Sequence, residues 1–179
     1  MIPTSPAPAS ALAQALAAAD ELPEPFETSL GFRGRFLPSD DPDVLIGESW
    51  VAPGGGAGPL HRHLRSTERF DVLEGAITVR LGRHEQVVHA GGSFTVPAGA
   101  PHTFVNHTGE EAHFTATFTP GHRIAEVFEA LLDIDGQPSL REAARLMAEF
   151  PEDFFYLAHI PVGLQRAVGR VVRALAPSA

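Results

Sequence analysis

Alternating hydrophobic and polar residues dominate the middle of the chain and predict strands. Ile77, Val79 and Leu81 alternate with Thr78 and Arg80, which is the period-two pattern of a strand with one buried face. Further strands are expected, between glycine, proline and aspartate turns, over 30–37, 44–52, 69–74, 93–96 and 111–118. Short strands at close, regular intervals predict a mainly β, closed or sandwiched antiparallel fold.

Beyond Pro120 the spacing of apolar residues changes from strand-like to helical. Ser139 followed by Glu142 has the pattern of a capping box, in which each residue satisfies a backbone N–H of the other at a helix start. Helices are therefore expected over 124–132, from Ser139 to about Glu149, and over 162–174. The last of these is amphipathic.

The first 25 residues are rich in alanine and proline and differ from the sequence that follows. A short helix is expected over 9–19, because Pro23 and Pro25 end any helix there. A length of 179 residues suits one domain with a sizeable core. We expect an N-terminal arm over 1–25, a β-barrel over 26–120 and, over 121–179, a C-terminal helical extension packed on the barrel.

Composition excludes several classes of partner. The formal net charge is −9 and no basic cluster interrupts the barrel region, which argues against nucleic acid. The chain has no cysteine, so disulfides and thiolate ligands are excluded and a cytoplasmic location is the default expectation. The first basic residue is Arg33, which does not suit a secretory signal. The last helix carries three arginines, too few to make membrane contact the favoured interpretation.

His61 and His63 are the first candidates for chemistry. Residues two apart on a strand point to the same side, so both imidazoles can face one metal ion. Glu68 lies five residues beyond His63, an odd offset that would put it on the wrong face of an unbroken strand. A turn or bulge over 64–67 is therefore required, and it would place the carboxylate on the next strand.

A second cluster follows the turn Pro97-Ala98-Gly99-Ala100-Pro101. His102, Phe104 and Asn106 then share one strand face. A proline-stiffened turn suits a ligand strand, because metal ligands must be placed to within a few tenths of an ångström. Three imidazoles and one carboxylate are a ligand set for a divalent transition metal with open positions.

These two clusters resemble the two sequence motifs of the cupin superfamily. A glycine followed by His-x-His, Glu and Gly resembles the first motif, and Gly, Pro-x-Gly, His and Asn resembles the second. Every motif position holds the expected residue, in order Gly55, His61, His63, Glu68 and Gly75, then Gly91, Pro97, Gly99, His102 and Asn106. The resemblance implies a single jelly-roll β-barrel, a metal held by His61, His63, Glu68 and His102, and a homodimer.

Neighbouring residues are candidates for the wall of a ligand pocket. Glu48 and Trp50 share a strand face. If that face is the inner wall, Glu48 is a second carboxylate near the metal; if it is the outer wall, Glu48 faces solvent. The remaining candidates for the pocket are Phe70, Phe94, Phe104 and His113. The aromatic members are equally explained as core residues, because a small barrel fills its interior with side chains.

The ligand set is compatible with more than one function. A substrate phenolate, enolate or carboxylate could bind the metal, lose a proton to Glu68 or to a metal-bound hydroxide, and become electron-rich. Attack by dioxygen would make the protein a dioxygenase, and reprotonation elsewhere would make it an isomerase or lyase. A binding or sensing module would stop at ligand binding. A resemblance to bacterial quercetinase-like dioxygenases favours the first, acting on a small anionic or enolisable compound. The metal itself stays open among Fe, Mn, Ni, Co, Cu and Zn.

Overall fold

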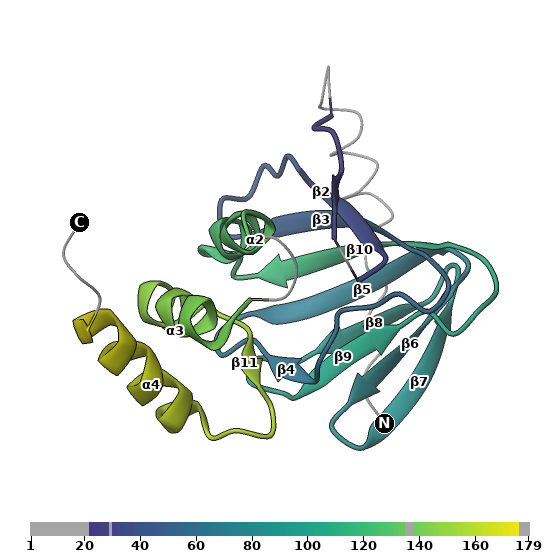
Figure 1. Cartoon of the computed structure of the whole chain (residues 1–179). Coiled ribbons are helices and arrows are strands. Elements are labelled where there is room, and N and C mark those ends of the chain that lie inside the picture. Colours follow the sequence, from purple (N-terminus) through teal and green to yellow (C-terminus); the bar gives the residue numbers. More distant parts are fainter. Residues whose placement is uncertain (1–21, 29, 135–137, 176–179) are drawn as a thin grey trace.

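Two antiparallel sheets packed face to face form the main body of the molecule. The computed structural model describes residues 22–28, 30–134 and 138–175 (Figure 1). One sheet has six strands in the spatial order β1 (Phe26–Glu27), β2 (Phe32–Leu37), β3 (Leu45–Val51), β10 (Ala112–Thr119), β5 (Thr67–Glu74) and β8 (Ser93–Val96). The other has five, in the order β11 (Tyr156–Leu157), β4 (His61–Arg62), β9 (His102–Val105), β6 (Ala76–Leu81) and β7 (His84–His89). This arrangement confirms the predicted mainly β fold.

The chain crosses from one sheet to the other at Gly75, between β5 and β6. Its backbone has a φ of 68°, which L side chains rarely adopt. A Cβ at this position would also lie 2.9 Å from the carbonyl oxygen of Glu111. Glycine is therefore required both for the backbone conformation and for the close approach of the loop that contains Glu111, just before β10.

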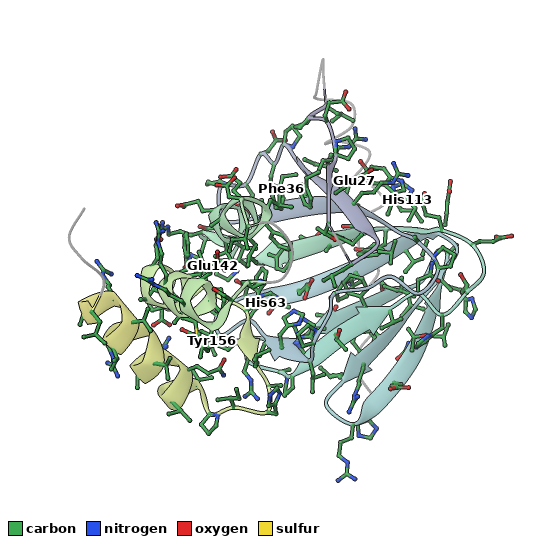
Figure 2. All side chains as sticks on the ribbon, viewed as in Figure 1. Glu27, Phe36, His63, His113, Glu142 and Tyr156 are labelled. Carbon is green, nitrogen blue, oxygen red and sulfur yellow. The ribbon has the colours of Figure 1, made fainter. Side chains whose placement is uncertain are left out.

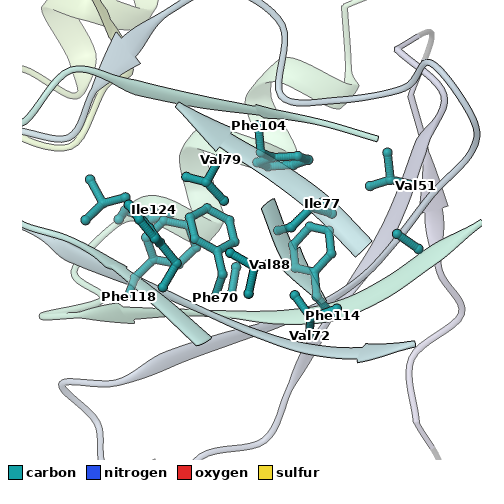
Figure 3. Packing of buried hydrophobic residues seen from close by; sticks show 14 residues of the cluster. Val51, Phe70, Val72, Ile77, Val79, Val88, Phe104, Phe114, Phe118 and Ile124 are labelled. Atoms are coloured by element: carbon teal, nitrogen blue, oxygen red, sulfur yellow. The ribbon is translucent and has the colours of Figure 1, made fainter. Parts of the chain in front are cut away.

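The core lies between the two sheets, as Figure 3 shows. Ile77 and Val79 of β6 are fully buried there, which confirms the alternation read from the sequence. They pack in one cluster with Phe70 of β5, Phe104 of β9 and Phe114 of β10. Burial of aromatic and aliphatic side chains from both sheets holds the sandwich together, at about 1.5–3 kcal/mol for each large side chain.

Three helices lie together at one end of the sandwich (Figure 1). They are α2 (Ile124–Leu132), α3 (Leu140–Glu149) and α4 (Val162–Leu175), close to the predicted ranges. The capping box is confirmed, because the Ser139 side chain accepts from the Glu142 N–H and the Glu142 carboxylate accepts from the Ser139 N–H. None of the helices in the described ranges is long and apolar enough to cross a membrane. The helix expected over 9–19 lies outside the described residues.

The C-terminal extension also contributes a strand that the sequence analysis did not predict. β11 pairs with β4, with Leu157 opposite His61 and Tyr156 opposite Arg62. The Ala158 N–H donates to the Leu60 carbonyl at 3.0 Å, and the Arg62 guanidinium donates to the Ala158 carbonyl at 2.7 Å. The extension is thus hydrogen-bonded to β4, the strand that contains His61 and leads into His63.

Candidate metal centre

Three histidines converge where β4 and β9 begin. His61 and His102 are the first residues of these two strands and lie directly opposite each other in the register. His63 follows β4 in the loop to β5. One ring nitrogen from each of the three lies within 4.8 Å of the others. Local strand pairing therefore brings together residues that are about forty positions apart in the sequence.

Glu68 reaches the same point from the opposite sheet. It is the second residue of β5 and is 5% exposed. Its Oε2 lies 2.7 Å from Nε2 of His102 and 3.4 Å from Nε2 of His63. The turn expected between His63 and Glu68 is present, and the Ser66 hydroxyl fixes it by donating to the Pro120 carbonyl at 2.6 Å. The four candidate ligands thus bridge the two sheets.

Backbone carbonyls set the tautomers of two of the rings. Nδ1 of His61 lies 3.0 Å from the Pro59 carbonyl oxygen, and Nδ1 of His102 lies 3.0 Å from that of Ala100. A carbonyl oxygen only accepts, so each Nδ1 must carry the proton. In a neutral ring, Nε2 is then left with a lone pair directed at the common point. This is the usual support for a metal-binding histidine.

His61 and Glu68 have the protonation states that metal ligands need, a neutral imidazole and a carboxylate. Burial, together with neighbouring His63 and His102, lowers the pKa of His61 to about 3. Burial raises the pKa of Glu68, but hydrogen bonds from His102 and His63 outweigh it and hold the pKa below its usual value. At neutral pH His61 is therefore uncharged and Glu68 is a carboxylate.

The contact between His102 and Glu68 is itself a test of whether a cation fits. With Nδ1 protonated, Nε2 of His102 and Oε2 of Glu68 are both acceptors at 2.7 Å. Such an approach needs a positive charge, either a proton on Nε2 or a metal ion held by both atoms. Burial lowers the pKa of His102, yet Glu68 raises it overall. The donor set therefore fits a divalent ion that replaces this proton.

His63 is supported by aromatic rings. Its Nδ1 is buried and has no hydrogen-bond partner in the described part of the chain. The ring centroid lies 4.8 Å from that of Phe155 and 5.3 Å from that of Phe118, both in edge-on geometry. Phe155 precedes β11 and also lies 5.8 Å from the ring of His61. Figure 2 shows His63 between the sheets, close to the C-terminal extension.

A cavity of about 980 Å³ opens from these four residues and continues beneath the C-terminal helices. Phe104, one of the predicted pocket residues, lies on its wall. Phe70 and Phe94 belong to the core cluster between the sheets instead. Side chains there pack against other core residues, so the core explanation holds for these two phenylalanines.

Glu48 and Trp50 lie on the outer face of β3, which is one of the two alternatives that the sequence left open. They share a strand face as expected, and their partners lie on the side opposite the core residue Phe114. The Glu48 carboxylate accepts from Arg35 at 2.7 Å and from His113 at 2.9 Å. Trp50 stacks on His113 with ring centroids 4.8 Å apart. Glu48 borders the cavity, yet its carboxylate is hydrogen-bonded to Arg35 and His113. Trp50 and His113 lie on the outer face, and Figure 2 labels His113 there.

The sequence analysis missed two residues that shape the site. Phe155 covers the rings of His61 and His63. Gln165 of α4 is 5% exposed and holds β11 through hydrogen bonds to the backbone of Leu157. The run Phe154-Phe155-Tyr156-Leu157, rich in residues that favour strands, was the available signal.

Comparison with known proteins gives one domain family and several similar structures. The cupin domain family matches residues 48–118. KdgF from Halomonas sp. is 21% identical, with a TM-score of 0.50, over 54% of this chain and 86% of that one. A RmlC-like cupin from Shewanella frigidimarina is 25% identical, with a TM-score of 0.49, over 55% of this chain and 85% of that one. No curated protein shows a significant match. Residues 48–118, which carry both motifs, therefore match a cupin domain, and the fold around them is similar to that of KdgF.

Proposed function

We propose that this protein binds one divalent transition metal through His61, His63, Glu68 and His102 and is a metal-dependent oxidoreductase. A dioxygenase acting on a small anionic or enolisable organic compound is the specific activity proposed. The observation that carries the proposal is the convergence of three imidazole nitrogens and one carboxylate oxygen at the end of a largely apolar cavity. Such a set leaves open positions on an octahedral ion.

The protein groups around the metal favour an anionic oxygen donor. Three neutral imidazoles and one carboxylate leave a divalent ion with a net charge of about +1. When bound there, the metal would supply Lewis acidity and a position for an oxygen of the substrate. Glu68, the one carboxylate of the set, and a metal-bound hydroxide are the two candidate acceptors of a proton from an enolisable carbon or hydroxyl.

Aromatic rings beside the ligands support oxidative chemistry. Phe118 and Phe155 flank His63 and make an apolar wall beside the ligands. In such surroundings an electron-rich substrate anion meets dioxygen, which is apolar, more readily than it meets a proton donor. The same ligand set also serves proton transfer alone, so the assay has to separate the two outcomes.

Metal analysis followed by oxygen-uptake measurements tests this function. We expect purified, untagged protein to contain iron, manganese, nickel or cobalt, and flavonols or β-diketones to consume oxygen in step with product formation. Glu68→Gln should lose metal affinity and turnover together. Turnover without oxygen would instead assign an isomerase or lyase, and tight binding with no product under either atmosphere would assign a binding module.

Oligomeric state is part of the same proposal. A homodimer is expected from the family resemblance, and light scattering would then give about twice the chain mass of 19.1 kDa. A mass equal to that of one chain would refute it. The cytoplasmic location stays a prediction.

A further inference from the structure

The cavity is much larger than a small compound at the metal would need. Its volume of about 980 Å³ lies at the upper end of the range of about 300–1,000 Å³ that is typical of small-molecule sites. The part farthest from the barrel is walled by the C-terminal helices, through Leu131 of α2, Ala143 and Met147 of α3, and Leu164 and Val168 of α4. These side chains are aliphatic or contain a thioether, and they offer no strong hydrogen bond.

The described wall of the cavity carries few charged groups. Their positions favour a negatively charged group of a ligand only at the metal end. The charged groups are Glu27, Arg35, Glu48, Glu68 and Asp133. Arg35 is the one cation among them, and its guanidinium is bound to Glu48 at 2.7 Å. An anionic group elsewhere in the cavity would therefore meet carboxylates, hydrocarbon or the neutral polar groups of Thr28, Ser49 and Gln165, and none of these supplies a positive charge.

Apolar side chains also line the entrance. Leu140 and Leu164, from the first turns of α3 and α4, border the cavity and are 77% and 57% exposed. Exposed leucines at the rim of a hydrophobic cavity favour the entry of a hydrophobic group. From rim to metal, the wall thus changes from aliphatic to aromatic and ends in polar ligands.

We propose that the site takes an elongated amphipathic molecule with one acidic or enolic oxygen head and an extended apolar body. The head lies at His61, Glu68 and His102, and the body lies beneath α2, α3 and α4. This inference rests on the proposed function for the head group alone. Compact, polyhydroxylated compounds are disfavoured, since their hydroxyls would lose hydrogen bonds to water against apolar walls.

Chain-length dependence of binding is the direct test. Straight-chain carboxylates of about four to twelve carbons are titrated calorimetrically into protein loaded with Zn²⁺, so that no redox turnover interferes. We expect each added methylene to tighten binding about two- to fourfold until the cavity is filled. Fused-ring carboxylates of matched carbon number show whether the body is an alkyl chain or a ring system. An affinity independent of the apolar body would overturn the inference.

Matched variants on α4 localise the effect. Leu164 and Val171 are both 57% exposed on α4, but only Leu164 borders the cavity. Leu164→Asp should weaken binding of the longest carboxylate about tenfold or more and leave that of the shortest unchanged, whereas Val171→Asp should match the parent protein. Ala143→Trp, which fills the cavity from α3, should likewise shorten the longest chain accepted. Equal losses in the Leu164 and Val171 variants would contradict the assigned position of the body.

Removing the metal separates this inference from the proposed function. After chelation, the carboxylates should lose their advantage over the corresponding methyl esters, while the dependence on chain length persists. Persistence without any oxygen uptake by the iron- or manganese-loaded protein would uphold the inference and refute the dioxygenase. Oxygen uptake with small enolisable compounds, combined with no chain-length dependence, would do the reverse.

Discussion

The side chain of Gln165 hydrogen-bonds to the edge of β11 that does not face β4. Its removal should therefore destabilise β11, the strand beside the metal centre. The Leu157 N–H donates to the Gln165 Oε1 at 3.1 Å. The Gln165 Nε2 donates to the carbonyls of Leu157 at 2.9 Å and Ile160 at 2.8 Å. The side-chain amide therefore acts as a neighbouring peptide group on one edge of β11, while β4 occupies the other.

The expected cost of Gln165→Ala follows from these three hydrogen bonds. Each contributes about 0.5–1.5 kcal/mol net, and a buried group left without a partner costs about 1–3 kcal/mol. Leu157 and Ile160 are half-buried, so water can satisfy part of what is lost. We expect the free energy of unfolding to fall by about 2–3 kcal/mol.

Urea unfolding measures the loss, and hydrogen exchange over 156–160 locates it. Gln86, an exposed glutamine of β7, provides the control, because Gln86→Ala should change stability by less than about 0.5 kcal/mol. Metal affinity of the Gln165 variant should also fall, since Leu157 lies opposite His61. Equal stability of the two variants, with unchanged exchange at β11, would refute the reasoning.

The remaining predictions concern stability and metal removal. Asn106→Ala should lower the free energy of unfolding by about 3–5 kcal/mol in urea, because the buried side chain makes four hydrogen bonds, one to Val51 of β3 and three within the loop after β9. Gly169→Ala should destabilise by about 1–3 kcal/mol, since its Cβ would lie 2.9 Å from the Ala144 carbonyl, whereas Gly163→Ala in open space should raise the melting temperature slightly. Saturating metal at about 100 times its Kd should add about 2.7 kcal/mol to the parent protein and much less to Glu68→Gln, as calorimetry would show.

The predicted ligand set depended on local spacing, which is why it could be read from the sequence. A His-x-His pair, a turn and a second strand suffice to place His61, His63 and Glu68 within a short segment. His102 was a candidate from its own cluster, but only the resemblance to cupins placed it with the other three, because no local rule supplies its position opposite His61. The structure brings all four side chains together, and metal binding by them is a proposal that titration can test.

The sequence left open which face of β3 points inward, because the barrel leaves room there for the cavity. Inward positions usually carry large apolar side chains, and on that rule Trp50 marks the inside. The inward residues bordering the cavity are instead Gly47 and Ser49, which are small. Trp50 is large for another reason, since it stacks on His113 and lies under the guanidinium of Arg33 at 4.9 Å. Strand parity groups residues by face, but only tertiary packing decides which face is buried.

β11 escaped prediction because two residues carry no periodicity, and its existence depends on partners far away in the sequence. The same dependence gives the C-terminal extension a role in the metal centre. β4 is two residues long and would be the edge of its sheet without β11. With β11 in place, β4 is paired on both sides, by β9 and by the extension, and Phe155 is brought against His63. α4, which walls part of the cavity, also holds β11 through Gln165, so the same helix bounds the cavity and supports the strand that pairs with His61.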